Sequence, residues 1–149
     1  MSLLLLLVSV IGISSYFLFK DKINLLDVDH SAVDWNGKKQ KDTSGEENTI
    51  AIPGFEKVTL YANETKQAVN FHNPEINDCY FKISLIHPDG SVLWISDLIE
   101  PGKGMYSIEL EKTLAVGEYE NAVLKYECFS LNDQSPLNGS EINLKLVVV

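Results

Sequence analysis

Apolar and polar residues alternate along most of the chain after residue 56, which is the pattern of half-buried β-strands. Two such segments, 79–85 and 122–129, contain the only two cysteines of the chain. In each segment the apolar residues share one face: Cys79, Phe81, Ile83 and Leu85 in the first, and Ala122, Leu124, Tyr126 and Cys128 in the second. Both cysteines are therefore expected to point into the core.

Seven segments in all have strand character, and turn residues such as His87-Pro88-Asp89-Gly90 separate them. The expected strands span residues 57–62, 67–72, 79–85, 91–96, 105–110, 119–131 and 141–148. Short strands at regular spacing, with no helical period between them, predict an all-β fold. We expect an antiparallel β-sandwich of about seven strands over residues 52–149.

The N-terminal region has a different character. Leu3 to Phe19 is a run of seventeen uncharged, mostly apolar residues, which as a helix would span about 26 Å. It predicts a transmembrane helix over residues 1–22 that serves as a membrane anchor or uncleaved signal. A cleaved signal peptide is the alternative, although the best small-residue site, Gly12-Ile13-Ser14, lies inside the run. Residues 27–49 mix charged residues with Gly, Ser and Asn, show no sustained apolar period and contain the isolated Trp35, so residues 23–51 are expected to form a polar linker or stalk.

The membrane orientation is suggested by two signals that disagree. Lys20 and Lys22 follow the apolar run and no lysine precedes it, so the positive-inside rule favours a cytoplasmic C-terminal side. Two inward-facing cysteines instead fit one disulfide in an oxidising compartment, with two reduced buried thiols as the alternative. We expect a single-pass protein of the cytoplasmic membrane whose C-terminal domain is extracytoplasmic.

Composition argues against one class of partner. The chain has 21 acidic and 12 basic residues, a net charge of -9, and every basic residue is a lysine. Without arginine it lacks the bidentate donor that suits phosphates and base edges, and its net charge repels them. Nucleic acid is therefore not an expected partner.

The spacing Cys79, Trp94, Cys128, with Tyr126 two residues before the second cysteine, resembles the signature of immunoglobulin-like domains. The resemblance implies a disulfide between two sheets, with Trp94 packed against it and Tyr126 as the corner tyrosine. The segment 114–119 resembles instead the corner of fibronectin type III and related bacterial sandwiches, which makes Tyr119 the rival corner residue. The order of anchor, stalk and sandwich also resembles small uncharacterised surface proteins of low-GC Gram-positive bacteria, a likeness that implies no activity.

Residues that could carry chemistry are scattered. His30, His72 and His87 share no metal-ligand spacing, and neither a Gly-x-Ser-x-Gly elbow nor a phosphate-binding loop is present. We therefore expect no enzyme, and we assign no catalytic, cofactor-binding or metal-binding residue. Tyr80 and Trp94 are candidate ligand contacts if both rings are exposed, and the alternative is that Trp94 lies in the core.

These features favour a non-catalytic binding module that recognises a protein or a cell-envelope polymer. The alternative is a surface assembly subunit that self-associates by β-strand addition, through an edge strand or through the apolar terminal segment 142–149. An enzyme or a metal-binding protein is the least favoured interpretation.

Overall fold

The computed structural model describes residues 25–37 and 49–149. The anchor expected over residues 1–22 lies outside the described residues, as does the linker segment 38–48. Between residues 25 and 37 and between 49 and 149, no helix has the length and hydrophobicity that a membrane crossing requires.

The described chain is all-β, as the alternation of apolar residues predicted. Its strands are β1 (Val33–Asp34), β2 (Lys57–Leu60), β3 (Lys66–His72), β4 (Cys79–Ile86), β5 (Val92–Ile95), β6 (Lys103–Glu109), β7 (Gly117–Ser130) and β8 (Pro136–Val148). The seven expected strands correspond to β2 to β8. β1 could not be predicted, because two paired residues in a polar stretch show no alternation of apolar and polar positions.

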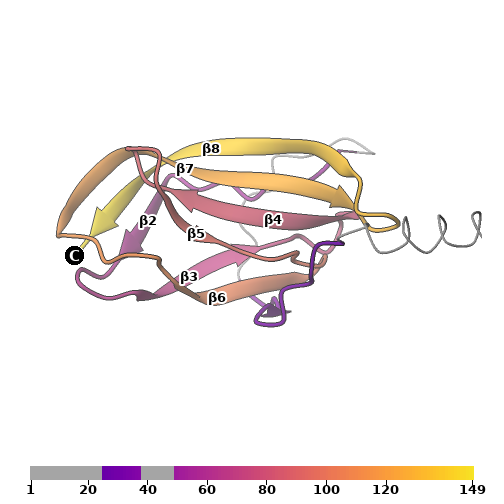
Figure 1. Cartoon of the computed structure of the whole chain (residues 1–149), viewed down its shortest axis with the longest axis horizontal. Helices are drawn as coiled ribbons and strands as arrows, with labels where there is room; N and C mark the ends of the chain where they lie inside the picture. The colour runs from indigo at the N-terminus through magenta and orange to yellow at the C-terminus, as the bar shows by residue number, and fades with distance from the viewer. Residues whose placement is uncertain (1–24, 38–48) are drawn as a thin grey trace, which may run out of the picture.

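The strands form two sheets, which Figure 1 shows as two layers. One sheet has the order β2-β8-β7-β4-β5 and the other has the order β1-β6-β3. The prediction of a β-sandwich is therefore confirmed. The prediction that all strands are antiparallel is wrong, because β2 runs parallel to β8. Lys57 lies beside Lys145 at one end of this pairing and Leu60 lies beside Val148 at the other. The same pairing encloses residues 145–148 between β2 and β7, so this end of the terminal strand offers no free edge.

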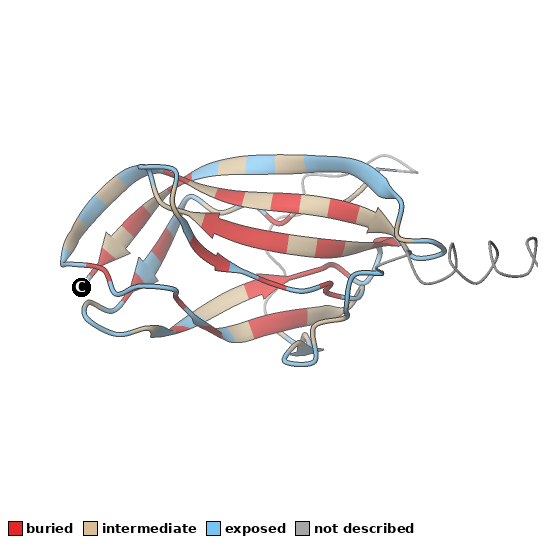
Figure 2. Ribbon diagram, in the orientation of Figure 1, coloured by how far each residue is buried: buried red, intermediate tan, exposed pale blue. Residues whose placement is uncertain are grey.

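The core lies between the two inner faces, where buried residues alternate with partly exposed ones along much of β4, β7 and β8 (Figure 2). Aromatic rings pack together in it. Phe81 and Tyr126 lie 5.3 Å apart between ring centroids, in an edge-to-face arrangement. Phe71 of the smaller sheet lies 5.8 Å from Trp94 of the larger one. Such pairs add about 1 kcal/mol each to the stabilisation from burial alone.

The cysteines correct the strand assignment implied by the immunoglobulin-like signature. β4 pairs directly with β7, with Cys79 opposite Ser130 and Phe81 opposite Cys128. Cys79 and Cys128 are therefore diagonal neighbours within one sheet and do not face each other between two sheets. Trp94 lies on β5 opposite Leu85, six residues along β4 from Cys79, so it does not pack against the cysteines.

The two candidate corner tyrosines occupy different environments. Tyr119 donates its hydroxyl to the backbone carbonyl of Ala115, over 2.9 Å. This is the contact that defines a tyrosine corner. Tyr126 is buried between the sheets, 1% exposed, and its hydroxyl lies 3.4 Å from the carbonyl of Pro53.

Residues 26–36, here called the N-terminal strap, belong to the expected stalk but lie along the sandwich. The strap first runs beside Leu98, which donates its amide to Asp27 and accepts the amide of Asp29. It then crosses to the smaller sheet, where β1 pairs with the start of β6. The strap is held by backbone pairing at an edge, which requires no apolar side chains, so the sequence pattern did not predict it.

Candidate ligand-binding cleft

A cavity of about 550 Å³ opens at the end of the sandwich where β3 ends and β6 begins. Three segments form most of its wall: strap residues 34–37, the β3–β4 loop from His72 to Ile76, and the turn at Pro101-Gly102. Two of these segments are loops held by the sheets. A site of this kind can differ in specificity without changing the core.

Trp35 is the central side chain of this cleft. Its ring stacks on the ring of His72 with 3.8 Å between centroids and 8° between planes. Its indole N–H donates to the side-chain oxygen of Asn70, over 2.7 Å, and its backbone amide donates to Gly102. His72 is only 4% exposed, so the imidazole is a fixed platform on which the indole rests.

Gly104 allows the strap to approach this closely. A Cβ atom at residue 104 would lie 2.8 Å from the carbonyl oxygen of Phe71 and 2.9 Å from Trp35 Cδ1. Real Cβ contacts essentially never come this near. A side chain at this position would therefore push Trp35 away from His72 and change the wall of the cleft.

Two buried asparagines fix the loop beneath the cleft. The Asn73 side chain donates to the carbonyls of Cys79 and Ile99, over 2.8 and 2.9 Å. Asn77 donates to Asn73 and to the carbonyl of Ala51, and it accepts the amide of Ala51. Buried polar groups in a fully bonded network hold one conformation, so the β3–β4 loop is a rigid part of the site.

Charges sit at the rim of the cleft. Lys103 Nζ lies 2.6 Å from Asp34 Oδ1. The hydrogen bond and the charge of Lys103 lower the pKa of the Asp34 carboxyl, and the same contact raises the pKa of Lys103. Tyr106 completes this side by donating its hydroxyl to the Asn36 side chain and accepting the Asn36 amide, each over 2.9 Å. Glu75 lines the opposite wall.

This arrangement suits binding. The lining residues are Asp34, Trp35, Asn36, Gly37, Pro53, His72, Pro74, Glu75, Ile76, Pro101 and Gly102. They supply an indole ring, two carboxylates and an amide. Among the described residues that line the cleft there is no serine, threonine or cysteine that could act as a nucleophile.

The thiol pair lies at the same end of the molecule. Cys79 and Cys128 are buried, 1% and 2% exposed, and both are free thiols in the structure. The hydrogen bond between them, together with burial, raises the pKa of Cys128 above its ordinary value. Neighbouring strands thus bring the two sulfurs into contact, and the disulfide itself stays a prediction.

The structure does not bring the other sequence-predicted residues together. Trp94 is 7% exposed and faces the core, whereas Tyr80 is partly exposed opposite Phe129 on the outer face. The two rings therefore do not form one contact patch.

The histidines are also separate. His30 lies 3.7 Å from Asp27 and is exposed, and His87 lies 2.9 Å from Asp89. Only His72 lines the cleft. Within the described part of the chain, no three His, Cys, Asp or Glu residues are grouped as metal ligands.

Sequence reasoning missed His72, Asn73 and Asn77 as parts of a site. They belong to a segment with the pattern of a strand end and a turn, and the partners Ile99, Ala51 and Trp35 lie 26 or more residues away in the sequence. The one available signal was Trp35, a large apolar ring isolated in a polar stretch.

Comparison with known proteins adds little. No family model matches the sequence, and no curated protein matches it. Among solved structures, the chain is similar to the crystal structure of CopC from Methylosinus trichosporium OB3b. The similarity has 15% sequence identity and a TM-score of 0.35, and it covers 64% of this chain and 85% of that chain.

Proposed function

We propose that this protein is a membrane-anchored, extracytoplasmic, non-catalytic binding module that recognises a protein or a cell-envelope polymer. The observation that carries the proposal is the cleft in which Trp35 of the strap stacks on the buried His72. The anchor is the apolar run from Leu3 to Phe19.

The chemistry of the cleft supports this class of ligand. An indole ring provides an apolar surface for a sugar ring or a peptide side chain. Asp34, Glu75 and Asn36 at the rim provide oxygens and an amide for hydroxyl and amine groups. Because the asparagine network and the stack on His72 hold the walls, little ordering would oppose binding.

The finer assignment of the fold is also a proposal. We assign the sandwich to the immunoglobulin-like and fibronectin type III-like class. Its support is the pairing of β3 with β6 in one sheet, the order β8-β7-β4-β5 in the other, and the Tyr119 corner. Kinship with surface proteins of low-GC Gram-positive bacteria rests on the layout of the sequence alone.

The proposed extracytoplasmic localisation is tested with a membrane-impermeant thiol reagent on intact cells that express the full chain. An extracytoplasmic, oxidised domain predicts that Cys79 and Cys128 are labelled only after reduction from outside. Labelling only after cell lysis, without any reduction, would show that Lys20 and Lys22 set the opposite orientation.

Binding is tested by sedimenting the full-length chain with cell-wall sacculi of a low-GC Gram-positive bacterium. We expect Trp35→Ala to lower the sedimented fraction several-fold. Tyr61→Ala, which removes an exposed ring at the other end of the sandwich, is the matched control and should bind like the wild type. Equal sedimentation of the two variants, or no binding of the wild type to sacculi or to any cross-linked envelope protein, would reject the cleft as the binding site.

A further inference from the structure

Five exposed apolar side chains gather at the end of the sandwich that carries the cleft. They are between 37% and 69% exposed: Leu25, Leu26, Ile76, Leu131 and Leu137. Leu25 and Leu26 lead into the strap, Ile76 lies in the β3–β4 loop, and the other two flank the β7–β8 turn. We call this group the apolar end. Contiguous exposed apolar surface marks sites of protein or membrane contact.

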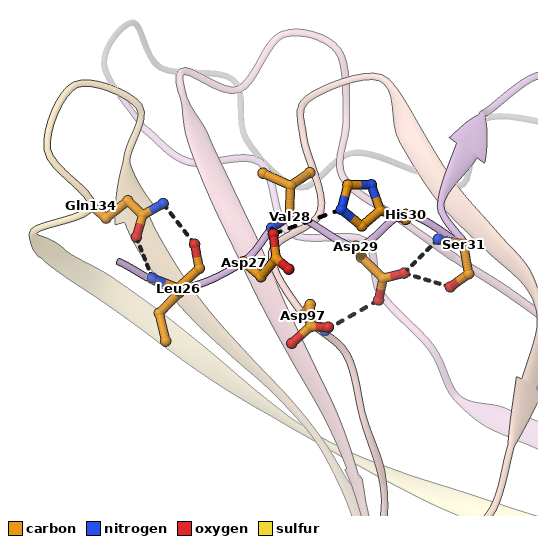
Figure 3. A network of polar contacts seen from close by, with 8 residues as sticks. All are labelled: Leu26, Asp27, Val28, Asp29, His30, Ser31, Asp97 and Gln134. Atoms are coloured by element: carbon orange, nitrogen blue, oxygen red, sulfur yellow. Dashed lines mark hydrogen bonds and ion pairs between the residues drawn. The ribbon is translucent and has the colours of Figure 1, made fainter. Parts of the chain in front are cut away.

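Specific contacts explain why these segments lie together. The Gln134 side chain accepts the amide of Leu26 over 2.7 Å and donates to its carbonyl over 3.0 Å (Figure 3). This pair of hydrogen bonds holds the start of the strap against the β7–β8 turn. Ile76 and Leu137 line one cavity, and the pairing of Cys79 with Ser130 brings the β3–β4 loop beside Leu131.

The path of the chain puts this end near the expected anchor. The apolar run ends at Phe19, and only residues 20–24 separate it from Leu25. Fully extended, that connection reaches at most roughly 20 Å. The sequence predicted a spacer that continues to residue 51, but the strap meets the sandwich at Leu26. An anchor formed by residues 3–19, as the proposed function requires, would therefore hold the apolar end close to the bilayer.

Charge at this end favours lipid contact through apolar side chains over electrostatic attraction. Residues 131–138, which span the β7–β8 turn and the start of β8, contain Asp133 as their only charged residue and no lysine. Binding through anionic headgroups needs clusters of basic residues, whereas leucines exposed on a loop fit the boundary between headgroups and acyl chains.

We propose that the apolar end lies on the lipid surface, with the side chains of Leu25, Leu131 and Leu137 in the interface. The sandwich would then stand on the membrane by this end, and the Trp35 cleft would open beside the headgroups. This inference rests on the anchor of the proposed function and adds the orientation of the domain.

The test is fluorescence quenching in vesicles of phosphatidylcholine and phosphatidylglycerol that contain the full-length chain. Leu131→Trp introduces a fluorophore at the apolar end, and Val116→Trp introduces one at a more exposed site at the opposite end. Lipids with brominated acyl chains should quench the added Trp of Leu131→Trp, with a clear loss of intensity beyond that of the wild type. The Val116→Trp chain should lose no more intensity than the wild type. Leu137→Trp is the second reporter if Leu131→Trp does not fold.

The outcomes separate the two proposals. If the chain stays in the vesicles after a carbonate wash but neither added Trp is quenched, the sandwich stands off the bilayer and only this inference fails. Equal quenching at both ends also overturns it, because the sandwich would then lie on its side. Loss of the wild-type chain from the vesicles in the wash would remove the anchor and, with it, the proposed function.

Discussion

The two ends of the sandwich are built from the same strands but differ in the polar contacts, cavities and exposed side chains that they carry. At the far end, where β7 begins and β8 ends, polar groups are used internally. The buried Gln67 side chain accepts the Tyr61 amide and donates to the carbonyls of Tyr61 and Glu64, and Tyr119 bonds Ala115. At the apolar end, the cleft, the thiol pair and the exposed leucines lie close together. The far end also exposes apolar side chains, such as Tyr61 and Val116, so what distinguishes the apolar end is the cleft that lies beside its exposed leucines.

The largest expected effect concerns the thiol pair at the apolar end. Joining Cys79 to Cys128 closes a loop of about 50 residues, which raises the free energy of unfolding by about 4 kcal/mol in the chain-entropy model. Urea unfolding of the full chain in oxidised and reduced form measures this difference. The Cys128→Ser chain, which cannot form the bond, should show no difference between the two conditions. If the wild type behaves likewise, the pair is a reduced part of the core.

The buried amides of the two ends can be compared directly. Asn73→Ala removes the side-chain hydrogen bonds to the buried carbonyls of Cys79 and Ile99 and to Asn77, and we expect it to lower the free energy of unfolding by about 3 kcal/mol. Gln67→Ala at the far end should cost about 2 kcal/mol, because its partners lie in a partly exposed turn. Urea midpoints measure both, and the exposed Asn132→Ala should stay within about 0.5 kcal/mol of the wild type.

Ligand binding sharpens the same comparison. Both variants are destabilised, but only Asn73→Ala alters the floor of the cleft. We therefore expect a lower fraction of this variant, and not of Gln67→Ala, to sediment with sacculi under conditions where both remain folded. Equal loss in Gln67→Ala would mean that stability alone, and not the local geometry, governs binding.

The smallest expected effect is a change in the pKa of Asp34 at the rim of the cleft. Lys103 lowers the pKa of Asp34 below its ordinary value of 3.8. A lowered folded pKa contributes stability above pH 3.8 that is lost as the pH falls through the folded pKa. Carboxyl NMR should show Asp34 titrating below 3.8 in the wild type and near that value in Lys103→Met. Lys145→Met, which removes the exposed pair with Glu118 and Glu120 at the far end, should leave Asp34 unchanged.

The alternation of apolar residues was enough to predict seven of the eight described strands and much of the core. Alternation places Phe81, Ile83, Leu124 and Tyr126 inside, because a strand has two faces and only one meets the other sheet. That rule depends on near neighbours in the chain, so it can be applied to one sequence without knowledge of the fold.

The neighbours of each strand and the contacts between distant segments could be read only from the three-dimensional arrangement. It made the cysteines diagonal neighbours within one sheet, moved Trp94 away from them and paired β2 in parallel with β8. It also brought Trp35 onto His72 and Leu26 onto Gln134, contacts that span 37 and 108 residues. Such contacts follow from the packing of whole sheets and from backbone pairing at their edges. Neither produces a periodic pattern of apolar and polar residues in the sequence. The candidate site consists almost entirely of contacts of this kind.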